Sequence, residues 1–475
     1  MNKHGANGFA AQSQQALDDT ALQSALGHAQ SGFVKKRAQA IAMVDEFEQL
    51  KANAQAAKRQ ALANLAPLLE QFEQNLIRNG GEVHWAQTPQ ELNATVMAIA
   101  RNANGRRIIK GKSMIGEECE LNAALESAGF DVVESDLGEY IIQLAKEPPS
   151  HIIAPAIHKT RQQVAELFRQ YHALGERGLD AISDLVGEAR TVLREAFLTA
   201  DIGITGANVL VAENGSIALV TNEGNGDLSA TLPRVHIVVT SIEKVVASME
   251  DASLILEVLA RSATGQHMSA YTSFYSGPRQ AQDPDGPDQF HVILLDNGRS
   301  EMLGTPFEPM LNCIKCGACL NHCPVYTNVG GHAYGWVYPG PMGSVLTPLL
   351  QGLDAALPLP NASTFCGRCE EVCPMGIPLP DLLRQLRAQQ HEQKREPRRW
   401  RWGLTLYSRL SRHPRLFSWN LRLSRAMLRW LPQRAWPNQR TPIRPSGDTT
   451  FLEQWRTRAQ NGLKNAAQNG PQQGK

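Results

Sequence analysis

The sequence predicts an α/β domain that follows a set of N-terminal helices and precedes a cysteine-rich region and a basic, helical C-terminal region. Three observations support this architecture. Short apolar segments alternate with amphipathic ones through the middle of the chain. Seven of the eight cysteines lie between Cys313 and Cys373, and residues 381–475 hold 20 Lys and Arg against 5 Asp and Glu. A chain of 475 residues is also too long for one ordinary core.

Residues 1–79 are predicted to form an N-terminal helical region. From residue 12 to residue 79 the chain is rich in Ala, Gln, Leu, Glu and Lys, and Pro67 is its only proline. These residues favour helix, and the pair Gly80 and Gly81 is typical of a helix end.

Residues 80–305 are predicted to form the α/β domain. The segments EVHWA, RRIIKGKSM, DVVESD and HIIAPAI resemble strands, and the helical segments 88–102, 116–129 and 158–172 alternate with them. This alternation predicts βαβ units and a largely parallel sheet. A longer helix is expected over 182–200, followed by a hairpin that turns at Asn214-Gly215. RVHIVVTSIEKVV and FHVILLDN complete the expected strands, and the domain is expected to end near Thr305.

Residues 306–385 are predicted to bind iron–sulfur clusters. The segment CIKCGACLNHCPVY has the spacing C-x2-C-x2-C-x3-C-P, in which three thiolates bind one cluster and the fourth binds the other cluster of a pair. The segment FCGRCEEVCP supplies the second half. In a reducing cytosol, such cysteines indicate metal ligands rather than disulfides. The predicted ligands of the first 4Fe–4S cluster are Cys313, Cys316, Cys319 and Cys373, and those of the second are Cys323, Cys366 and Cys369.

The second cluster lacks a fourth cysteine, because Ser363 stands where the first half has Cys313. It is therefore expected to be a 3Fe–4S cluster, or a 4Fe–4S cluster whose fourth ligand is Ser363, His322, His332 or water. The alternative for the whole region is a zinc site, since sets of four cysteines also bind zinc. Zinc motifs rarely combine this spacing with a following proline.

Polar residues near the predicted strand ends are candidates for a small-molecule site, because ligands of open α/β sheets bind at the carboxyl ends of strands. A carboxylate could bind Lys112 and the amides of residues 221–226, unless the segment is a plain turn and Lys112 a surface charge. The candidates are Lys112, Ser113, residues 134–139, His151, His158 and residues 221–226. Cys119 has acidic neighbours, which oppose thiolate formation, and it is expected to pack within a helix.

The C-terminal region, 386–458, holds six of the eight Trp residues together with many Arg residues. Apolar residues at helical spacing predict a surface that docks on an acidic protein partner or on an anionic membrane. No nucleic-acid-reading module accompanies the charge, so no nucleic acid is expected as a partner. Residues 459–475 are polar and are predicted to be disordered.

The sequence predicts a cytoplasmic protein, with or without peripheral contact to a membrane. No apolar run reaches the roughly 18 to 20 residues that span a bilayer. The N-terminal segment MNKHGANGFAAQSQQ lacks the apolar stretch of a signal peptide.

The order of these motifs resembles the lactate utilization protein B family. The resemblance rests on TGANVLVAENGSIALVTNEGNGDLSATLPRVHIVV, CIKCGACLNHCPVY, GGHAYGWVYPGPMG and FCGRCEEVCP, and it covers about residues 20–458. It implies a LUD-type α/β domain, similar to CoA transferases and sugar-phosphate isomerases. It also implies two 4Fe–4S clusters held by the seven cysteines, so that Ser363 fits the family.

The resemblance implies an electron-transfer subunit that works with two other lactate-utilization subunits to oxidise L-lactate to pyruvate, allowing growth on lactate. The electron acceptor stays unknown. The alternative is that the chain is itself the catalytic oxidoreductase, with its substrate at the LUD domain or at the incompletely cysteine-ligated cluster. A regulator that senses oxygen or iron through its clusters is a third hypothesis.

Overall fold

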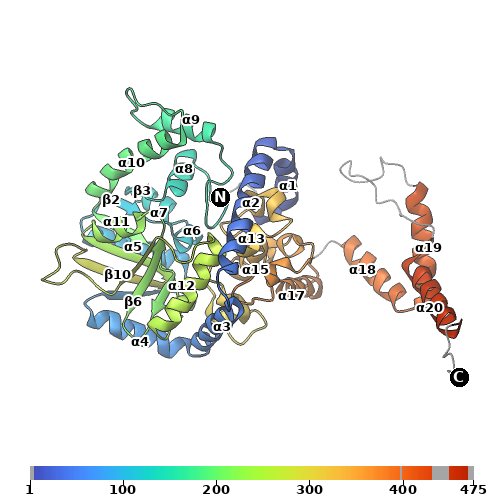
Figure 1. The fold of residues 1–475 in the computed structure, drawn as a ribbon. Helices are drawn as coiled ribbons and strands as arrows, with labels where there is room; N and C mark the ends of the chain where they lie inside the picture. Colours follow the sequence, from blue (N-terminus) through green and yellow to red (C-terminus); the bar gives the residue numbers. More distant parts are fainter. Residues whose placement is uncertain (1–4, 396–397, 431–448, 469–475) are drawn as a thin grey trace, which may run out of the picture. The chain divides into compact units, whose positions relative to one another are not determined.

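The computed structural model describes residues 5–395, 398–430 and 449–468. The chain divides into two compact units, Met1–Gln390 and His391–Lys475, and each is described by itself. The first unit contains the N-terminal helices, the α/β domain and the cysteine-rich region (Figure 1).

Four α-helices form the N-terminal region. They follow a short 3-10 helix, η1 (Ala6–Gly8), and are α1 (Phe9–Asp18), α2 (Thr20–Ala42), α3 (Phe47–Ala63) and α4 (Leu65–Arg78). Asp19 separates α1 from α2 and caps α2 by accepting a hydrogen bond from the amide of Leu22 (3.0 Å). Pro67 lies in the first turn of α4, where its missing amide removes no intrahelical bond.

A six-stranded parallel sheet forms the centre of the α/β domain, in the order β1-β10-β7-β4-β2-β3. Alternate residues of β7 lie in different cores: Ile237 in one and Val238 in another, so both faces of the sheet are buried. The strands are β1 (Glu82–Ala86), β2 (Arg107–Lys110), β3 (Asp131–Glu134), β4 (Ile202–Thr205), β7 (Val235–Ser241) and β10 (Gln289–Leu295).

A smaller sheet, in the order β8-β5-β6-β9, packs beside it. Strands β5 (Val209–Val211) and β6 (Ser216–Thr221) pair antiparallel around the predicted turn at Asn214-Gly215. Gly215 has φ 70°, and a Cβ there would lie 2.4 Å from the amide nitrogen of Leu76 in α4. Only glycine therefore allows α4 to pack on the hairpin. Strands β8 (Val245–Val246) and β9 (Tyr271–Tyr275) complete this sheet.

The remaining elements of the domain are mostly helices on the two sheets (Figure 1). They are α5 (Pro89–Asn102), α6 (Met114–Glu118), α7 (Leu121–Ser127), α8 (Leu137–Ala145), α9 (Arg161–Tyr171), α10 (Ile182–Thr199), α11 (Asn225–Thr231), η2 (Ile242–Lys244), α12 (Met249–Ala263) and η3 (Ser300–Met302). The predicted strand over 151–157 is wrong, since this segment is a loop. His151 Nδ1 accepts hydrogen bonds from the amides of Ile153 (3.0 Å) and Ala154 (3.1 Å), and Pro155 has no amide to give to a sheet.

The cysteine-rich region is helical and shares its core with the N-terminal helices. Buried Leu62 of α3 belongs to the same apolar cluster as Tyr334 and Leu383. The elements are η4 (Glu308–Asn312), α13 (Ala318–Asn321), α14 (Tyr326–Val329), η5 (His332–Tyr334), α15 (Gly340–Gln351), η6 (Leu353–Ala356), η7 (Leu359–Asn361), α16 (Arg368–Glu371) and α17 (Leu379–Glu392).

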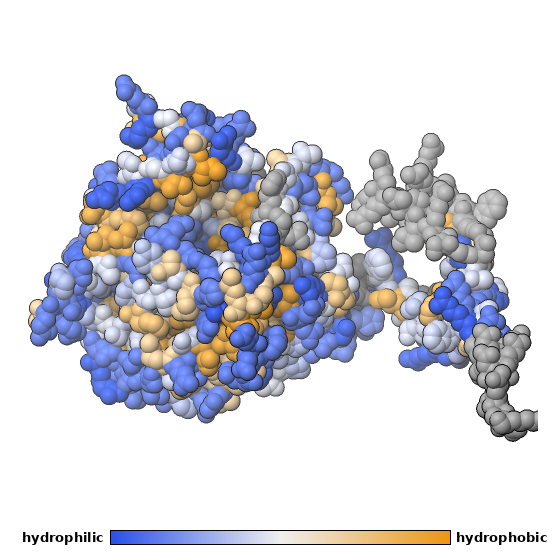
Figure 2. All heavy atoms as spheres, viewed as in Figure 1, coloured by the Kyte–Doolittle hydropathy of each residue, from blue (hydrophilic) through white to orange (hydrophobic). Residues whose placement is uncertain are grey.

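The second unit consists, over its described residues, of the helices α18 (Arg398–Ser411), α19 (Pro414–Trp430) and α20 (Phe451–Gln468). Hydrophobic residues lie between hydrophilic ones on these helices (Figure 2). Residues 459–468 continue α20, because their Ala, Gln, Leu and Lys residues favour helix. The disorder expected over 459–475 stays a prediction. Residues 469–475 lie outside the described residues. Among the described helices, none is long and apolar enough to cross a membrane.

Candidate metal centre and the adjoining cavity

The two cysteine segments repeat one backbone conformation. Lys315 (φ 58°) and Phe365 (φ 54°) both have a left-handed backbone conformation, which few non-glycine residues adopt. Each stands directly before a cysteine of its segment. Gly317 (φ 73°) and Gly367 (φ 80°) follow those cysteines. Each is the N-cap residue of a four-residue helix, α13 or α16. This internal repeat makes Cys313 and Ser363 equivalent positions.

The four cysteines predicted for the first cluster line one small apolar cavity. Cys313, Cys316 and Cys319 reach it from the loop and helix around α13, and Cys373 reaches it from beyond α16. The amide of Ile377 donates a hydrogen bond to Cys373 Sγ (3.5 Å). Four sulfur donors in an apolar cavity, with amides pointing at sulfur, fit a 4Fe–4S cluster. The rest of the lining is mostly apolar, with one charged residue, Lys315: Ile152, Ile314, Lys315, Gly317, Met342, Pro374, Met375, Ile377 and Leu379.

Burial disfavours the thiolate form of Cys316, Cys319 and Cys373. It raises the pKa of Cys316 to about 12 and that of Cys373 to about 11, and it raises the pKa of Cys319 further. The neighbouring sulfurs add to each shift, because thiolates repel one another. Ionising the set therefore requires a buried positive charge, which bound metal supplies.

The three cysteines predicted for the second cluster lie together nearer the surface. Cys323 and Cys369 are buried and Cys366 is exposed. Burial raises the pKa of Cys369 to about 12, and both Cys323 and Cys366 contribute to that shift. The amide of Arg368 lowers the pKa of the Cys366 thiol. Cys369 also raises the pKa of Cys319, so the two sets adjoin.

The side chains predicted as alternative fourth ligands already make hydrogen bonds. Ser363 Oγ accepts from the amide of Phe365 (3.1 Å). His322 Nδ1 bonds the carbonyl of Ala318 (2.8 Å), and His332 Nε2 bonds that of Pro148 (2.8 Å). Ser363 is the candidate whose backbone position matches that of a cysteine in the first half.

His151 and His158, predicted as site residues, have structural contacts. His151 is buried, and burial lowers its pKa to about 4. Its Nε2 atom bonds Asn321 Oδ1 (3.0 Å), which ties the 148–157 loop to α13. His158 Nε2 lies 2.7 Å from Glu147 Oε2.

Residues 134–139 also serve the fold, through a buried ion pair and a helix cap. Glu134 pairs with buried Lys110 (2.5 Å), and Asp136 caps α8 through the amides of Gly138 and Glu139. Cys119 follows α6 and is buried, and burial beside Glu118 raises its pKa.

A cavity of about 350 Å³ lies at the carboxyl ends of β2, β4 and β6. The structure brings Lys112, Ser113 and the 221–226 segment together in its lining, as the strand-end argument predicts. Cys313 lines this cavity as well as the cavity of the first cysteine set. The candidate small-molecule site therefore adjoins the candidate metal centre.

Three further lysines line this cavity and were missed by sequence reasoning: Lys58, Lys244 and Lys315. Lys58 comes from α3 and Lys244 from η2, so these two converge from segments far apart in the chain. Lys315 lies inside the CIKCG motif, and this position beside the predicted metal ligands is the one sequence feature that could have indicated it as a site residue.

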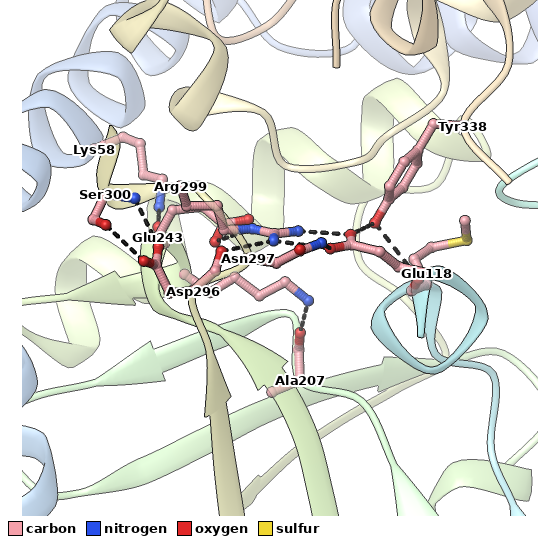
Figure 3. A network of polar contacts seen from close by, with 11 residues as sticks. Lys58, Glu118, Ala207, Glu243, Asp296, Asn297, Arg299, Ser300 and Tyr338 are labelled. Atoms are coloured by element: carbon pink, nitrogen blue, oxygen red, sulfur yellow. Dashed lines mark hydrogen bonds and ion pairs between the residues drawn. The ribbon is translucent and has the colours of Figure 1, made fainter. Parts of the chain in front are cut away.

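A buried polar network connects the cavity with the cysteine-rich region (Figure 3). Arg299 donates two hydrogen bonds to Glu118 (2.9 and 2.7 Å) and lies 3.0 Å from Glu243. Tyr338 also donates to Glu118 (2.6 Å). Burial opposes ionisation of both carboxylates, but Arg299 outweighs it and lowers the pKa of Glu118 and of Glu243, the latter to about 2. The Lys58 ammonium donates to the carbonyl of Glu243 at the other end of the network.

The comparisons with known proteins agree with this architecture. Residues 69–295 match the LUD domain model, and residues 309–377 match the model of the 4Fe-4S dicluster domain. Fold and site thus define an iron–sulfur protein with a LUD-type α/β domain.

Curated relatives identify the family. Lactate utilization protein B of Bacillus licheniformis is 44% identical over 382 residues, covering 80% of each chain. The protein of that name from a Geobacillus species is 44% identical, covering 81% of this chain and 80% of its own, and that from Bacillus subtilis is 42% identical, covering 80% and 79%. The chain belongs to the lactate utilization protein B family, which confirms the resemblance. A solved DUF162 family protein from Deinococcus radiodurans matches with 17% identity and a TM-score of 0.28, covering 49% of this chain and 98% of its own.

Proposed function

We propose that this chain is the iron–sulfur electron-transfer subunit of a complex that oxidises L-lactate to pyruvate and allows growth on lactate. The observation that carries the proposal is the pair of adjoining cysteine sets, four sulfurs in one and three in the other. We propose lactate as the substrate because the relatives are named lactate utilization protein B.

In this proposal Cys313, Cys316, Cys319 and Cys373 hold a 4Fe–4S cluster, and Cys323, Cys366 and Cys369 hold the second. When bound, such clusters carry single electrons between a donor and an acceptor. The chain positions the first set at the internal cavity through Cys313 and the second set at the surface through exposed Cys366.

The test is anaerobic purification, with iron and sulfide counted per chain and EPR spectra taken before and after dithionite. About eight irons and two interacting reduced signals are expected for two 4Fe–4S clusters, and about seven irons with an oxidised 3Fe–4S signal for a three-iron second cluster. Zinc without labile sulfide would contradict the proposal.

Two single cysteine variants test the assignment of the cluster ligands. Cys366→Ala should lower the iron content and remove the signal of the second cluster while leaving that of the first. Cys119→Ala is the matched control, because Cys119 is buried outside both sets and should leave iron content unchanged. Equal iron loss in both variants would refute the assignment.

The cavity beside Cys313 favours a second candidate function, in which this chain is itself the catalytic oxidoreductase. L-lactate added anaerobically to the isolated chain should then bleach its visible iron–sulfur absorption. Bleaching only after the other subunits are added favours the electron-transfer role.

We propose two other lactate-utilization subunits as partners, with an electron acceptor beyond them. The basic helices of the second unit are suited to docking, since Trp400 (61% exposed), Trp402 (81%) and Trp419 (63%) stand among arginines. An acidic subunit and an anionic membrane surface both fit this chemistry. Cosedimentation with anionic vesicles, compared with neutral ones, separates the membrane from the protein partner.

A further inference from the structure

We infer that the cavity beside Cys313 binds a small organic anion through the ammonium groups of its lysines. The sequence predicted a carboxylate at Lys112 and the amides of residues 221–226, and the structure adds Lys58, Lys244 and Lys315 to that site. The inference gives the α/β domain a binding role of its own, whether or not the chain oxidises the molecule that it binds.

The lining of the cavity holds more cationic side chains than carboxylates. Lys58, Lys112, Lys244 and Lys315 all line the cavity, and they reach it from four separate segments. The lining includes two carboxylates, Asp136 and Glu223. Asp136 is occupied in capping α8, where it accepts from two amides. Burial raises the pKa of Glu223, and the neighbouring carboxylate of Asp136 raises it further.

Among the described residues, the four lysines make hydrogen bonds or a ring contact in place of ion pairs. Lys112 donates to the carbonyl of Ile153 (2.6 Å), Lys244 to that of Ala207 (2.6 Å) and Lys58 to that of Glu243. Lys315 lies 4.3 Å from the centre of the Tyr338 ring. Within the described part of the chain, no carboxylate forms an ion pair with any of the four.

Lys110, in the neighbouring strand β2, shows the contrast. It is fully buried and pairs with Glu117 (3.0 Å) and Glu134 (2.5 Å), which raise its pKa despite burial. Lys58 and Lys244 lack such partners, and burial lowers their pKa to about 8, only partly opposed by Glu243. An ammonium ion has three donors, so each cavity lysine keeps donors for a ligand. A bound anion would supply the negative charge that Glu117 and Glu134 supply to Lys110.

The lining of the cavity combines apolar and polar residues, which favours an organic anion over an inorganic one. Ile153, Ile255, Leu259 and Phe33 form apolar parts of the wall, whereas Gly206, Asn208, Asn225 and Gly226 bring polar groups or close backbone. A volume of about 350 Å³ is within the range of small-molecule pockets. The ligand therefore carries a carboxylate or a phosphate group on a carbon skeleton.

The test is isothermal titration of the anaerobically purified full chain with L-lactate, pyruvate or inorganic phosphate. Saturable binding of either carboxylate supports the inference and assigns a carboxylate ligand. Binding of phosphate alone supports it and assigns a phosphate-bearing ligand. If none of the three binds at millimolar concentration, the inference is overturned, even where the iron count supports the electron-transfer role.

Variants locate the binding. Lys112→Met and Lys244→Met should each weaken binding about tenfold or more, since each removes a charge-assisted hydrogen bond. Lys35→Met, at an exposed lysine of α2, is the matched control and should bind as the parent does. Iron content and thermal unfolding show whether each variant folds, and Lys112→Arg, which keeps the charge, should retain binding. Unchanged affinity in folded Lys112→Met and Lys244→Met would overturn the inference.

Discussion

At the scale of single residues, Cys313 and Ser363 show how one atom separates two equivalent positions. Both precede a residue in the left-handed conformation by two positions, and both lie in matching halves of the repeat. A sulfur at Cys313 joins three others in a cavity, whereas the Ser363 hydroxyl accepts a local amide hydrogen bond. The first set of predicted ligands therefore has four cysteines, and the second set has three.

Ser363→Cys should complete the second set. A fourth thiolate favours a 4Fe–4S cluster over a 3Fe–4S cluster, so the iron count should reach about eight and any oxidised 3Fe–4S EPR signal should disappear. Ser183→Cys, which adds a thiol at an exposed position of α10, should change neither reading. An unchanged spectrum in Ser363→Cys would count against the equivalence of the two halves.

Lys244 predicts how anion binding depends on pH. It faces one carboxylate, Glu243, and the cations Lys58, Lys315 and Arg299, and burial lowers its pKa to about 8. Below that pH the ammonium is charged and affinity should be constant. Above it Lys244 loses its proton and affinity should fall, most steeply between pH 8 and 9.5 as an approximate window. Titrations across pH 6.5–9.5 should show this loss, and a flat profile in that range would contradict it.

Sequence patterns predicted the site unevenly, and the reason is distance along the chain. The seven cysteines lie within two short segments, so their spacing alone indicates a metal centre. Lys112 and the 221–226 segment were predicted from strand ends. Lys58, Lys244 and Arg299 converge from different elements, and no local pattern marks them.

At the scale of elements, apolar alternation predicted the strands of the parallel sheet well. It failed at 151–157, where His151 and Pro155 divert an apolar segment into a loop. That loop packs on the first cysteine segment, since a Cβ on Gly317 would lie 3.3 Å from Ile153 and 3.4 Å from His151. Helices α8 and α12 and strand β9 were not predicted. Both helices carry a local signal that was overlooked, the N-cap residue Asp136 for α8 and Ser248 for α12. Strand β9 depends on its pairing with β6.

The network around Arg299 joins several of these elements and should be costly to break. Arg299→Met would leave Glu118 and Glu243 buried without their cation, so the free energy of unfolding should fall by about 3–5 kcal/mol. Arg279→Met removes an exposed ion pair with Asp288 and should cost about 1 kcal/mol or less. Urea unfolding of the two variants gives the comparison, and similar losses would show that burial does not govern the effect.

At the scale of the whole molecule, charge is divided between the two units. Residues 381–475 hold 20 Lys and Arg against 5 Asp and Glu, whereas residues 1–380 hold 27 against 41. The apolar core of the cysteine-rich region ends at Leu386. The metal centre and the basic helices therefore belong to separate units, Met1–Gln390 and His391–Lys475.

A chain truncated after Arg395 should keep the iron and sulfide content of the full chain. It should lose salt-sensitive association with anionic vesicles or with an acidic partner subunit, because that binding is assigned to the basic helices. Iron analysis and cosedimentation at low and high salt measure both properties. Loss of iron on truncation would show that the second unit supports the metal centre.

Cys313 lines both the cysteine cavity and the lysine cavity, and this shared wall has a thermodynamic consequence. An anion held by the lysines and an extra electron held at the Cys313 set repel each other. Reciprocity requires that each weakens the binding of the other by the same factor. Reduction of the metal centre would therefore favour release of the anion, and an empty cavity would make the centre a better oxidant.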